Sequence, residues 1–490
     1  MRVIRPALLL LVLLLAACGE TTDANAAADA PAVVEDAGSD SSSTVEATTS
    51  SVATEEAQGN SFSTEVLPIL ETKCATCHND PGPGSIHWSL ETVSDAVDEA
   101  AFLGDYVDAG VMPPWPAGPL SVAFSNDRGL SPEERATLVE WASSGAEIDI
   151  EPSTLVRAAE VESLAEVDAT LYPEEPYQGS PDVLDDYRCL VYDPQLTEET
   201  WLVGYNFVPD QAEVVHHAIG YRAPASQRER AEAKDAADPG PGWSCYGGSG
   251  IGQDELFIGW APGQVPARYP DGAGLRMAAG DFIVLQIHYH YDLEAPLDNS
   301  SLQMDYTSSD EPLTEVQIMP FLGPAEIPCA TWQEGPLCDR DAAMAAAIEK
   351  YGRAGVRADE ANLLCGTRPS DYADMTNGIA SSECTLPIYR FGTLVSVLAH
   401  QHEIGETFRI TLNPGRPNEQ ILLDIPDWDF DWQFNYAPVE DITLTPGDTL
   451  KLECSWDRAN QKPGIEPAYI VWADGTYDEM CFATMTVLDD

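Results

Sequence analysis

Residues 282–290 read Phe-Ile-Val-Leu-Gln-Ile-His-Tyr-His, an apolar run that ends in two histidines one residue apart. A run of this length that is rich in aliphatic and aromatic residues predicts a buried β-strand. Side chains alternate between the two faces of a strand, so His288 and His290 are expected on the same face. Two imidazoles placed in this way can chelate copper or zinc. The stretch therefore predicts a β fold and a metal site together.

Two more histidine pairs lie in similar stretches. His216 and His217 are adjacent within residues 213–219, and His400 and His402 end the apolar run 394–402. One such pair would carry little weight, because structural histidines are common. Six of the 8 histidines fall into three strand-like pairs, which indicates metal sites. Imidazole clusters without carboxylate partners favour copper over calcium or magnesium, and an added thioether favours Cu(I).

The rest of the C-terminal region fits the same fold class. After a connector at 151–185, strand-like alternation is interrupted by clusters of Gly, Pro and Asp, and a clear helical pattern occurs only around 341–353. We therefore expect a multidomain protein whose large C-terminal body is mostly β.

A different motif occupies the N-terminal region. Cys74-Ala75-Thr76-Cys77-His78 is a CxxCH pattern, in which two thiols attach haem c covalently and the histidine supplies one axial ligand. A zinc site would need a second pair of ligands, but the only other histidine nearby is His87. Met112, in Val-Met-Pro-Pro-Trp, is the one methionine of this segment and is the expected second axial ligand. His87 is then a surface or propionate-side residue.

Residues 61–150 resemble class I cytochromes c, with a helix before CxxCH, a Met-Pro-Pro loop and a C-terminal helix. Ser131 as N-cap, Pro132 at the first helical position and Glu134 in a capping box predict the start of that last helix, and Gly145 predicts its end. The resemblance implies a small all-α domain. A haem with both axial positions filled would transfer electrons.

The first residues predict where the protein is located. Residues 1–18 combine two arginines, an apolar run and Cys18, and resemble the signal peptide and lipobox of bacterial lipoproteins. An ordinary signal peptide with an incidental cysteine is the alternative. Residues 19–60 contain no aromatic or basic residue and predict a disordered acidic tether. We expect an extracytoplasmic protein, periplasmic or at the cell surface, held at a membrane by lipid.

The charge balance excludes one class of partner. The 490 residues include 82 acidic and 24 basic side chains, a formal net charge of -58. Phosphate backbones would be repelled, so nucleic acid is not an expected partner.

From about residue 181 onward the chain resembles the copper type II monooxygenase family, which includes dopamine beta-monooxygenase and peptidylglycine alpha-hydroxylating monooxygenase. The motifs that carry the resemblance are His-His at 216–217, Gln-Ile-His-Tyr-His at 286–290, His-Gln-His at 400–402 and Asp-Glu-Met-Cys at 478–481. The resemblance implies two jelly-roll-like β-sandwich domains, at 186–313 and 314–490, with one copper ion each. It assigns one copper to His216, His217 and His288, and the other to His400, His402 and Met480. His290 is expected to lie beside the copper ligands without binding the metal, or to be structural.

The same resemblance implies the chemistry. His400, His402 and Met480 would hold the catalytic copper, which uses O2 to hydroxylate a C–H bond, while the all-histidine copper would store an electron. Haem c would take the place of ascorbate, itself reduced by an external donor. Leu398, Phe482 and Thr484 stand where the peptide-amidating enzyme has residues that bind a carboxylate, so a small, apolar substrate is expected. Alternating aromatics at 428, 430 and 432 would line its pocket or form an inward-facing strand stripe.

The cysteines agree with this assignment. Cys18 and the two haem cysteines leave eight of 11, an even number that predicts four disulfides in an oxidising compartment. From their positions relative to the ligands we expect Cys189–Cys245 and Cys454–Cys481. Three pairings stay open for the remaining four: Cys329, Cys338, Cys365 and Cys384.

Two other functions stay open at this point. One is a haem and copper electron-transfer or copper-handling lipoprotein without monooxygenase activity. The other is a structural or adhesive surface protein that carries the histidines only incidentally.

Overall fold

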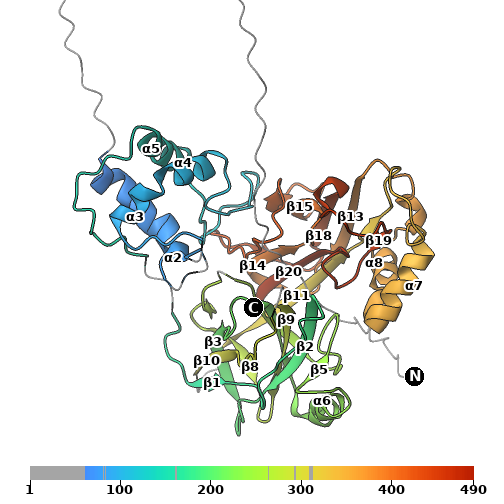
Figure 1. Ribbon diagram of the computed structural model, residues 1–490. Coiled ribbons are helices and arrows are strands. Elements are labelled where there is room, and N and C mark those ends of the chain that lie inside the picture. The colour runs from blue at the N-terminus through green and yellow to red at the C-terminus, as the bar shows by residue number, and fades with distance from the viewer. Residues whose placement is uncertain are drawn as a thin grey trace, which may run out of the picture.

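The computed structural model describes residues 61–80, 82, 84–85, 87–159, 163–262, 264–291, 294–307 and 313–489. The predicted signal peptide, Cys18 and the acidic tether lie outside the described residues. Figure 1 shows a helical unit beside two β bodies, and strands make up more of the chain than helices. The expectation of a mostly β protein is therefore confirmed.

The helical unit starts with one uninterrupted helical stretch that ends at His78. Its core includes Phe62, Leu103, Leu138 and Trp141. The helices are η1 (Phe62–Val66), α1 (Leu67–Ile69), η2 (Leu70–Cys74), α2 (Ala75–His78), α3 (Val93–Asp98), α4 (Ala100–Asp108) and α5 (Pro132–Ser143).

The predicted start of α5 is confirmed. Ser131 accepts a hydrogen bond from the Glu134 backbone N–H, and the Glu134 carboxylate accepts one from the Ser131 N–H. This reciprocal capping satisfies two N–H groups that the helix itself leaves without acceptors.

The first β body is a sandwich of two sheets. One sheet has the order β5-β2-β9-β4-β6, and the other contains β1-β10-β3-β8, with β7 paired to β3. Apolar residues of both sheets, such as Leu190, Leu285, Phe207 and Met304, share one core. The strands and helices are β1 (Ala169–Leu171), β2 (Asp185–Tyr192), β3 (Thr200–Val208), β4 (Val215–Ala223), η3 (Ala225–Gln227), α6 (Arg228–Asp235), β5 (Trp243–Ser244), β6 (Glu255–Trp260), β7 (Ala267–Arg268), β8 (Ala273–Met277), β9 (Phe282–His290) and β10 (Ser301–Thr307).

The second β body repeats this plan. Its sheets contain β11-β20-β14-β17 and β13-β18-β15-β16, with a small β12-β19 pair, and α7 and α8 lie on one flank in Figure 1. The α7 helix fits the predicted helical pattern. The elements are β11 (Thr314–Gly323), β12 (Glu326–Ile327), α7 (Arg340–Tyr351), η4 (Gly352–Val356), α8 (Arg357–Cys365), η5 (Pro369–Asp371), β13 (Ile379–Pro387), β14 (Gly392–His400), β15 (Gly405–Leu412), β16 (Gln420–Ile425), β17 (Thr443–Leu444), β18 (Thr449–Asp457), η6 (Arg458–Asn460), β19 (Ile470–Val471) and β20 (Cys481–Asp489).

The two β bodies are joined edge to edge. Strands β8 and β11 pair in parallel, with Thr314 beside Ala273 and Glu315 beside Gly274, so one sheet of each body merges into a single nine-stranded sheet. The expected connector at 151–185 also takes part in the fold: Val156 is buried in the helical unit, and β1 pairs with β10.

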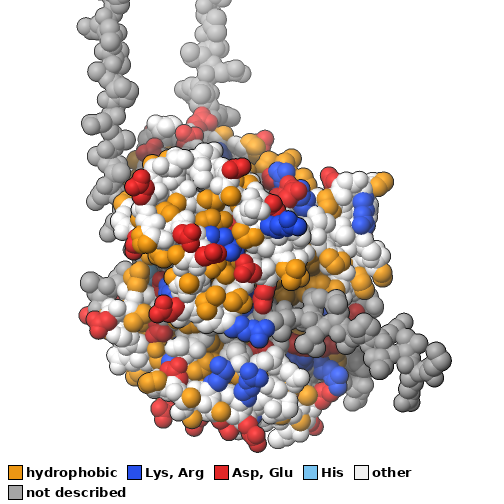
Figure 2. All heavy atoms as spheres, turned by 90° about the vertical axis from the view of Figure 1, so that its right-hand side faces the viewer, with side chains coloured by type: hydrophobic (Ala, Val, Ile, Leu, Met, Phe, Trp, Pro, Cys, Tyr) orange, Lys and Arg blue, Asp and Glu red, His pale blue; other side chains and the backbone are white. Residues whose placement is uncertain are grey.

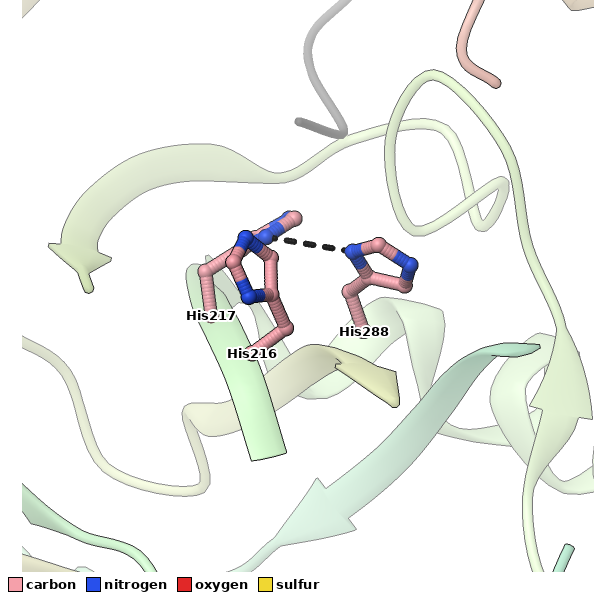
Figure 3. Close-up of side chains that lie close together, drawn as sticks. All are labelled: His216, His217 and His288. Atoms are coloured by element: carbon pink, nitrogen blue, oxygen red, sulfur yellow. Dashed lines mark hydrogen bonds between the residues drawn. The ribbon is translucent and has the colours of Figure 1, made fainter. Parts of the chain in front are cut away.

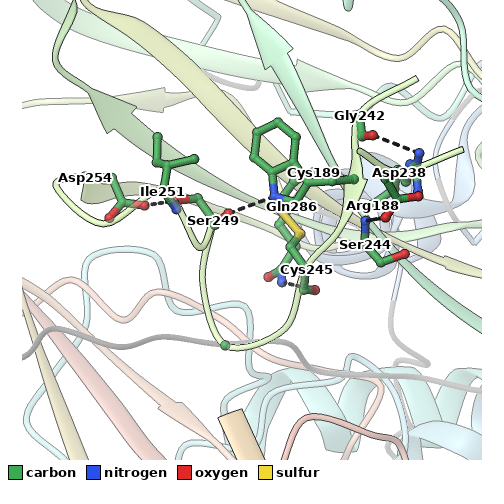
Figure 4. The surroundings of a disulfide bond; sticks show 12 residues. Arg188, Cys189, Asp238, Gly242, Ser244, Cys245, Ser249, Ile251, Asp254 and Gln286 are labelled. Carbon is green, nitrogen blue, oxygen red and sulfur yellow. Dashed lines mark hydrogen bonds and ion pairs between the residues drawn. A yellow bond between two sulfur atoms is a disulfide. The ribbon is translucent and has the colours of Figure 1, made fainter. Parts of the chain in front are cut away.

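Four disulfides link the cysteines of the β bodies. The expected pairs Cys189–Cys245 and Cys454–Cys481 are confirmed, and the other four cysteines form Cys329–Cys338 and Cys365–Cys384. Figure 4 shows Cys189–Cys245, where the Gln286 side-chain amide donates to the Cys245 carbonyl. Disulfides in this number indicate an oxidising, extracytoplasmic environment.

Two further observations concern the surface. Among the described residues, no helix is long and apolar enough to cross a membrane. On the face shown in Figure 2, basic side chains lie among acidic ones and among exposed apolar patches.

Candidate metal centre

Three histidines of the first β body converge on one point. His216 and His217 belong to β4 and His288 to β9, and one nitrogen of each ring lies within 4.8 Å of the others. The Nδ1 atoms of His217 and His288 are 3.3 Å apart. Figure 3 marks this contact with a dashed line. This is the first of the two predicted ligand sets.

A β-bulge brings the adjacent pair to the same side. Along β4, Val215 pairs with Tyr289 and His217 with His288, so the register shifts at His216, the extra residue of the bulge. Neighbouring residues of a regular strand point to opposite faces, but a bulge re-aims the extra side chain. The local break in pairing therefore lets both rings reach His288.

Burial keeps the His217 ring of this cluster neutral. His217 and His288 are buried, whereas His216 is half-buried. Burial holds the pKa of His217 well below its usual value, and charges on His288, His216, His400 and His402 would lower it further. Neutral imidazole is the form that binds a metal. The influence of His400 and His402 also shows that the second histidine pair lies within electrostatic reach of the first cluster.

A carboxylate stands beside the cluster, contrary to the expectation of imidazoles without carboxylate partners. Asp185 Oδ1 lies 3.0 Å from His288 Nε2 and 3.0 Å from His290 Nδ1. The aspartate does not belong to the ligand group itself, so the metal-binding donors are still imidazoles. His290 contacts the same carboxylate. The Tyr187 ring stacks on His288, with ring centroids 4.2 Å apart.

The second pair lies at the end of β14. His400 is the last residue of the strand, His402 follows in the next turn, and their ring centroids are 5.1 Å apart. His400 Nδ1 contacts the Gln433 side-chain oxygen, and its Nε2 is buried without a hydrogen-bond partner. His402 Nδ1 is 2.9 Å from the Asp478 carbonyl. Both rings therefore offer Nε2 to a metal.

Burial also keeps His400 neutral. It lowers the pKa of His400 to about 3, and the neighbouring His402 contributes to the decrease. Buried polar atoms normally have a partner, so the bare Nε2 of His400 is what a metal-ligand position would show.

Met480 lies close to the backbone of this pair. Strands β14 and β20 are antiparallel, and their ladder ends with His400 opposite Phe482, two residues from His402 and two residues from Met480. Met480 is fully buried. The Glu479 carboxylate accepts hydrogen bonds from the backbone N–H groups of His402, Ile404 and Met480 and thereby fixes their relative positions. Two imidazoles and a thioether form a donor set that suits Cu(I).

The CxxCH segment also fits a covalently bound haem. Cys74 and Cys77 form no disulfide, although all eight cysteines of the β bodies do. His78 Nδ1 lies 2.9 Å from the Trp88 carbonyl, which leaves Nε2 for an axial bond. Burial lowers the pKa of His78, so its neutral form is favoured.

The second axial ligand stays a prediction. Met112 is partly buried on the loop after α4, and its backbone N–H donates to the Tyr106 carbonyl. His87 is exposed, as expected for a residue outside the axial pair.

The helical unit is docked on the second β body next to His400. Trp115 of the helical unit packs against Phe434 and Tyr436, and Phe124 packs against Tyr436, with ring centroids 5.1 to 5.6 Å apart. Backbone bonds continue the contact, from Gly118 N–H to the Asp424 carbonyl, Ser125 N–H to the Ala437 carbonyl and Val439 N–H to the Ala123 carbonyl. We call residues 115–128 the docking segment.

Arg128 extends this contact toward the haem cysteines. Its guanidinium lies 5.1 Å from the centre of the Phe434 ring. Burial raises the pKa of Cys77 and the positive charge of Arg128 opposes that rise, which places Arg128 near the thiol. Phe434 follows Gln433, whose side chain contacts His400. A short series of neighbours thus connects Cys77 with a predicted metal ligand.

The expected strand stripe at 428–432 is wrong. The segment after β16 is irregular and contains no strand at 428–432. Trp428 is buried and its Nε1 donates to the His402 carbonyl. Trp432 stacks on Phe434. These aromatics support the second cluster and the docking contact.

Comparison with known proteins adds no assignment. No protein-family model matches the chain, and no curated protein matches it. Solved structures of low similarity include an allantoicase (11% identity, 61% of this chain and 86% of that one, TM-score 0.15). A Paenibacillus xanthan lyase is 8% identical over 70% of this chain and 28% of its own, with a TM-score of 0.15. Similarity at this level carries no argument about fold or function.

Proposed function

We propose that this protein is a membrane-anchored, copper-dependent monooxygenase that hydroxylates a C–H bond of a small, apolar substrate and receives electrons through haem c. The observation that carries the proposal is the pair of buried donor sets. One consists of His216, His217 and His288. The other consists of His400 and His402 with Met480, whose backbone N–H donates to the same Glu479 carboxylate as that of His402. Both lie at the junction of the two β bodies, within electrostatic reach of each other.

The two donor sets differ in a way that suits a division of roles. Three imidazoles suit copper in both oxidation states, whereas a thioether favours Cu(I) and binds weakly. Bound copper would supply one-electron chemistry and O2 activation, in which one oxygen atom enters the substrate, the other leaves as water, and two electrons and two protons are consumed. The chain keeps His217 and His400 neutral by burial, and it orients His288 through Asp185 and His400 through Gln433.

Uncharged residues beside His400 support an apolar substrate. The Phe482 ring centroid lies 6.5 Å from that of His400. Leu398 and Thr484 are paired across β14 and β20. None of these side chains can bind a carboxylate by charge, so a peptide with a free C-terminus is not the expected substrate.

The docking segment supports delivery of electrons from haem. Cys74, Cys77 and His78 would hold the haem, which stores one electron at a time. Trp115 and Arg128 keep this unit against Phe434, next to Gln433 and His400. A docked donor has a high effective concentration at its acceptor.

Metal analysis and isotope labelling test the proposal together. The purified, reconstituted protein should contain one haem and two copper ions per chain. Supplied with 18O2, an electron donor and a metabolite extract, it should place one labelled oxygen in a product. Copper binding and haem reduction without any labelled product would instead favour the electron-transfer alternative, and a folded chain that binds no copper would contradict both.

A further inference from the structure

Asp185, at the first position of β2, lies between the first histidine cluster and the second β body. In the antiparallel pairing of β2 with β9, Asp185 stands opposite His290, two positions from the pair formed by Tyr187 and His288. Its Oδ1 contacts His288 Nε2 and His290 Nδ1, both at 3.0 Å. Its Oδ2 accepts a hydrogen bond of 2.8 Å from the Thr476 hydroxyl. Both oxygens of this one carboxylate are therefore engaged.

Thr476 belongs to a segment that contacts both histidine clusters. Residues 472–480, which connect β19 to β20, end in Met480 and include Asp478, whose carbonyl lies 2.9 Å from His402 Nδ1. On the other side, the Tyr187 hydroxyl donates to the Asp474 carbonyl, and Tyr187 stacks on His288. Thr476 itself is buried, so water competes little for its hydrogen bond.

We propose that Asp185 is a positioning residue that holds His288 with Nδ1 toward the metal, and that its bond to Thr476 ties this orientation to the segment that carries Met480. An ionised carboxylate only accepts hydrogen bonds, so the nitrogen of His288 that faces it carries the proton. The lone pair is then on Nδ1, which faces His217 Nδ1. The proposal rests on the proposed function only in taking the three-histidine cluster as a metal site.

The geometry argues against Asp185 as a ligand in its own right. Its oxygens are occupied by two imidazole N–H groups and a hydroxyl, and they lie on the side of His288 away from His217. Removal of a hydrogen-bond partner that orients a metal-bound histidine typically costs about 10- to 100-fold in metal affinity. The hydrogen bond from Thr476 also links Asp185 to the segment that contacts the second cluster. Loss of this bond should therefore affect both clusters.

The test uses the full chain without metal and then with Cu(I) alone. Nitrogen-15 NMR of labelled histidines reports which nitrogen of His288 is protonated, and competition with a Cu(I) chelator gives the affinity of each cluster. Asp185→Asn should turn the single Nε2–H form of His288 into a mixture and should lower affinity at the first cluster by about 10- to 100-fold. Asp186→Asn is the matched control, because this neighbouring carboxylate contacts Tyr177 instead.

Thr476 separates positioning from a general loss of packing. Thr476→Val removes the hydroxyl at nearly constant volume and should weaken Cu(I) binding at both clusters, whereas Thr476→Ser should restore it. An Asp185→Asn chain that keeps the Nε2–H form and the wild-type Cu(I) affinity would overturn the proposal. If the wild-type chain bound no Cu(I) at these histidines, the assignment of the cluster as a metal site would be wrong. The protonation state of His288 would still show whether Asp185 orients this ring. Thermal melting of each variant checks that the chain is folded.

Discussion

At the residue scale, His400 depends on one acceptor for its orientation. Its Nδ1 contacts the Gln433 side-chain oxygen, which leaves Nε2 buried without a partner. Gln433→Leu removes the acceptor at similar volume, so the ring can rotate or change tautomer. Affinity for Cu(I) at the second cluster should fall by about 10- to 100-fold, as measured by chelator competition. Gln420→Leu, on β16, should leave it unchanged, and equal losses in both variants would contradict the assigned role.

A test of Met480 as a copper ligand needs a substitution that removes the sulfur and keeps the packing of the side chain. Met480→Ala would leave a cavity in a fully buried position and destabilise the chain by about 2–5 kcal/mol, which confuses the result. Met480→Leu conserves volume and should cost less than about 1.5 kcal/mol. We expect one copper per chain instead of two, loss of the sulfur contribution in X-ray absorption, and no hydroxylation, with haem content unchanged. A variant that keeps both coppers would remove Met480 from the ligand set.

At the element scale, the histidine pattern predicted which residues meet but not how the backbone brings them together. Alternation correctly put His288 and His290 on one face, where both contact Asp185. The same rule would send His216 and His217 to opposite faces, and it is the bulge in β4 that unites them. A bulge depends on pairing with another strand, so no local pattern reveals it.

The residues that sequence reasoning missed are those distant in the chain. Asp185 and Gln433 carry no motif, and each meets its histidine only through the fold, across 103 and 33 residues. Asp185 lies about four residues after the start of the stretch that resembles the monooxygenases. That resemblance is based on histidines and a methionine, so it gave no reason to single out one of 82 acidic residues. The capping box of α5, by contrast, involves only neighbours and was predictable.

Disulfide Cys454–Cys481 joins the two sheets of the second body directly beside Met480. Gly323 faces Cys481 across the ladder, where an added Cβ would lie 2.6 Å from its sulfur, so this close approach requires glycine. With 27 residues enclosed, replacing both cysteines by alanine should lower the free energy of unfolding by about 3.5 kcal/mol. It should also weaken copper binding at the second cluster.

The control for this prediction is the disulfide Cys329–Cys338, which encloses 9 residues. Its removal should cost about 2.5 kcal/mol in urea unfolding and leave copper affinity intact. If both double variants lost copper equally, destabilisation alone would explain the loss, and the local role of Cys454–Cys481 would be rejected.

At the scale of the whole molecule, the helical unit and the second β body are joined mainly by apolar rings and backbone bonds. Trp115 lies against Phe124, Phe434 and Tyr436. A contact of this kind depends little on salt, because apolar rings and backbone hydrogen bonds carry no net charge. The chain as a whole carries a net charge of -58, so two separate acidic units would repel each other at low salt.

This difference yields a kinetic prediction about the docking segment. If electrons pass within the docked arrangement, stopped-flow oxidation of the reduced haem by O2 in the copper-loaded protein should have the same rate at low and high ionic strength. If the units had to meet by diffusion, salt would screen their repulsion and speed the reaction.

Trp115→Ala should slow haem oxidation by at least about tenfold, because an undocked donor loses its effective concentration. It should also make the rate rise with salt. Phe102→Ala, 65% exposed on α4, is the matched control and should do neither. A wild-type rate that rises with salt would show that the docked contact is not the route by which electrons arrive.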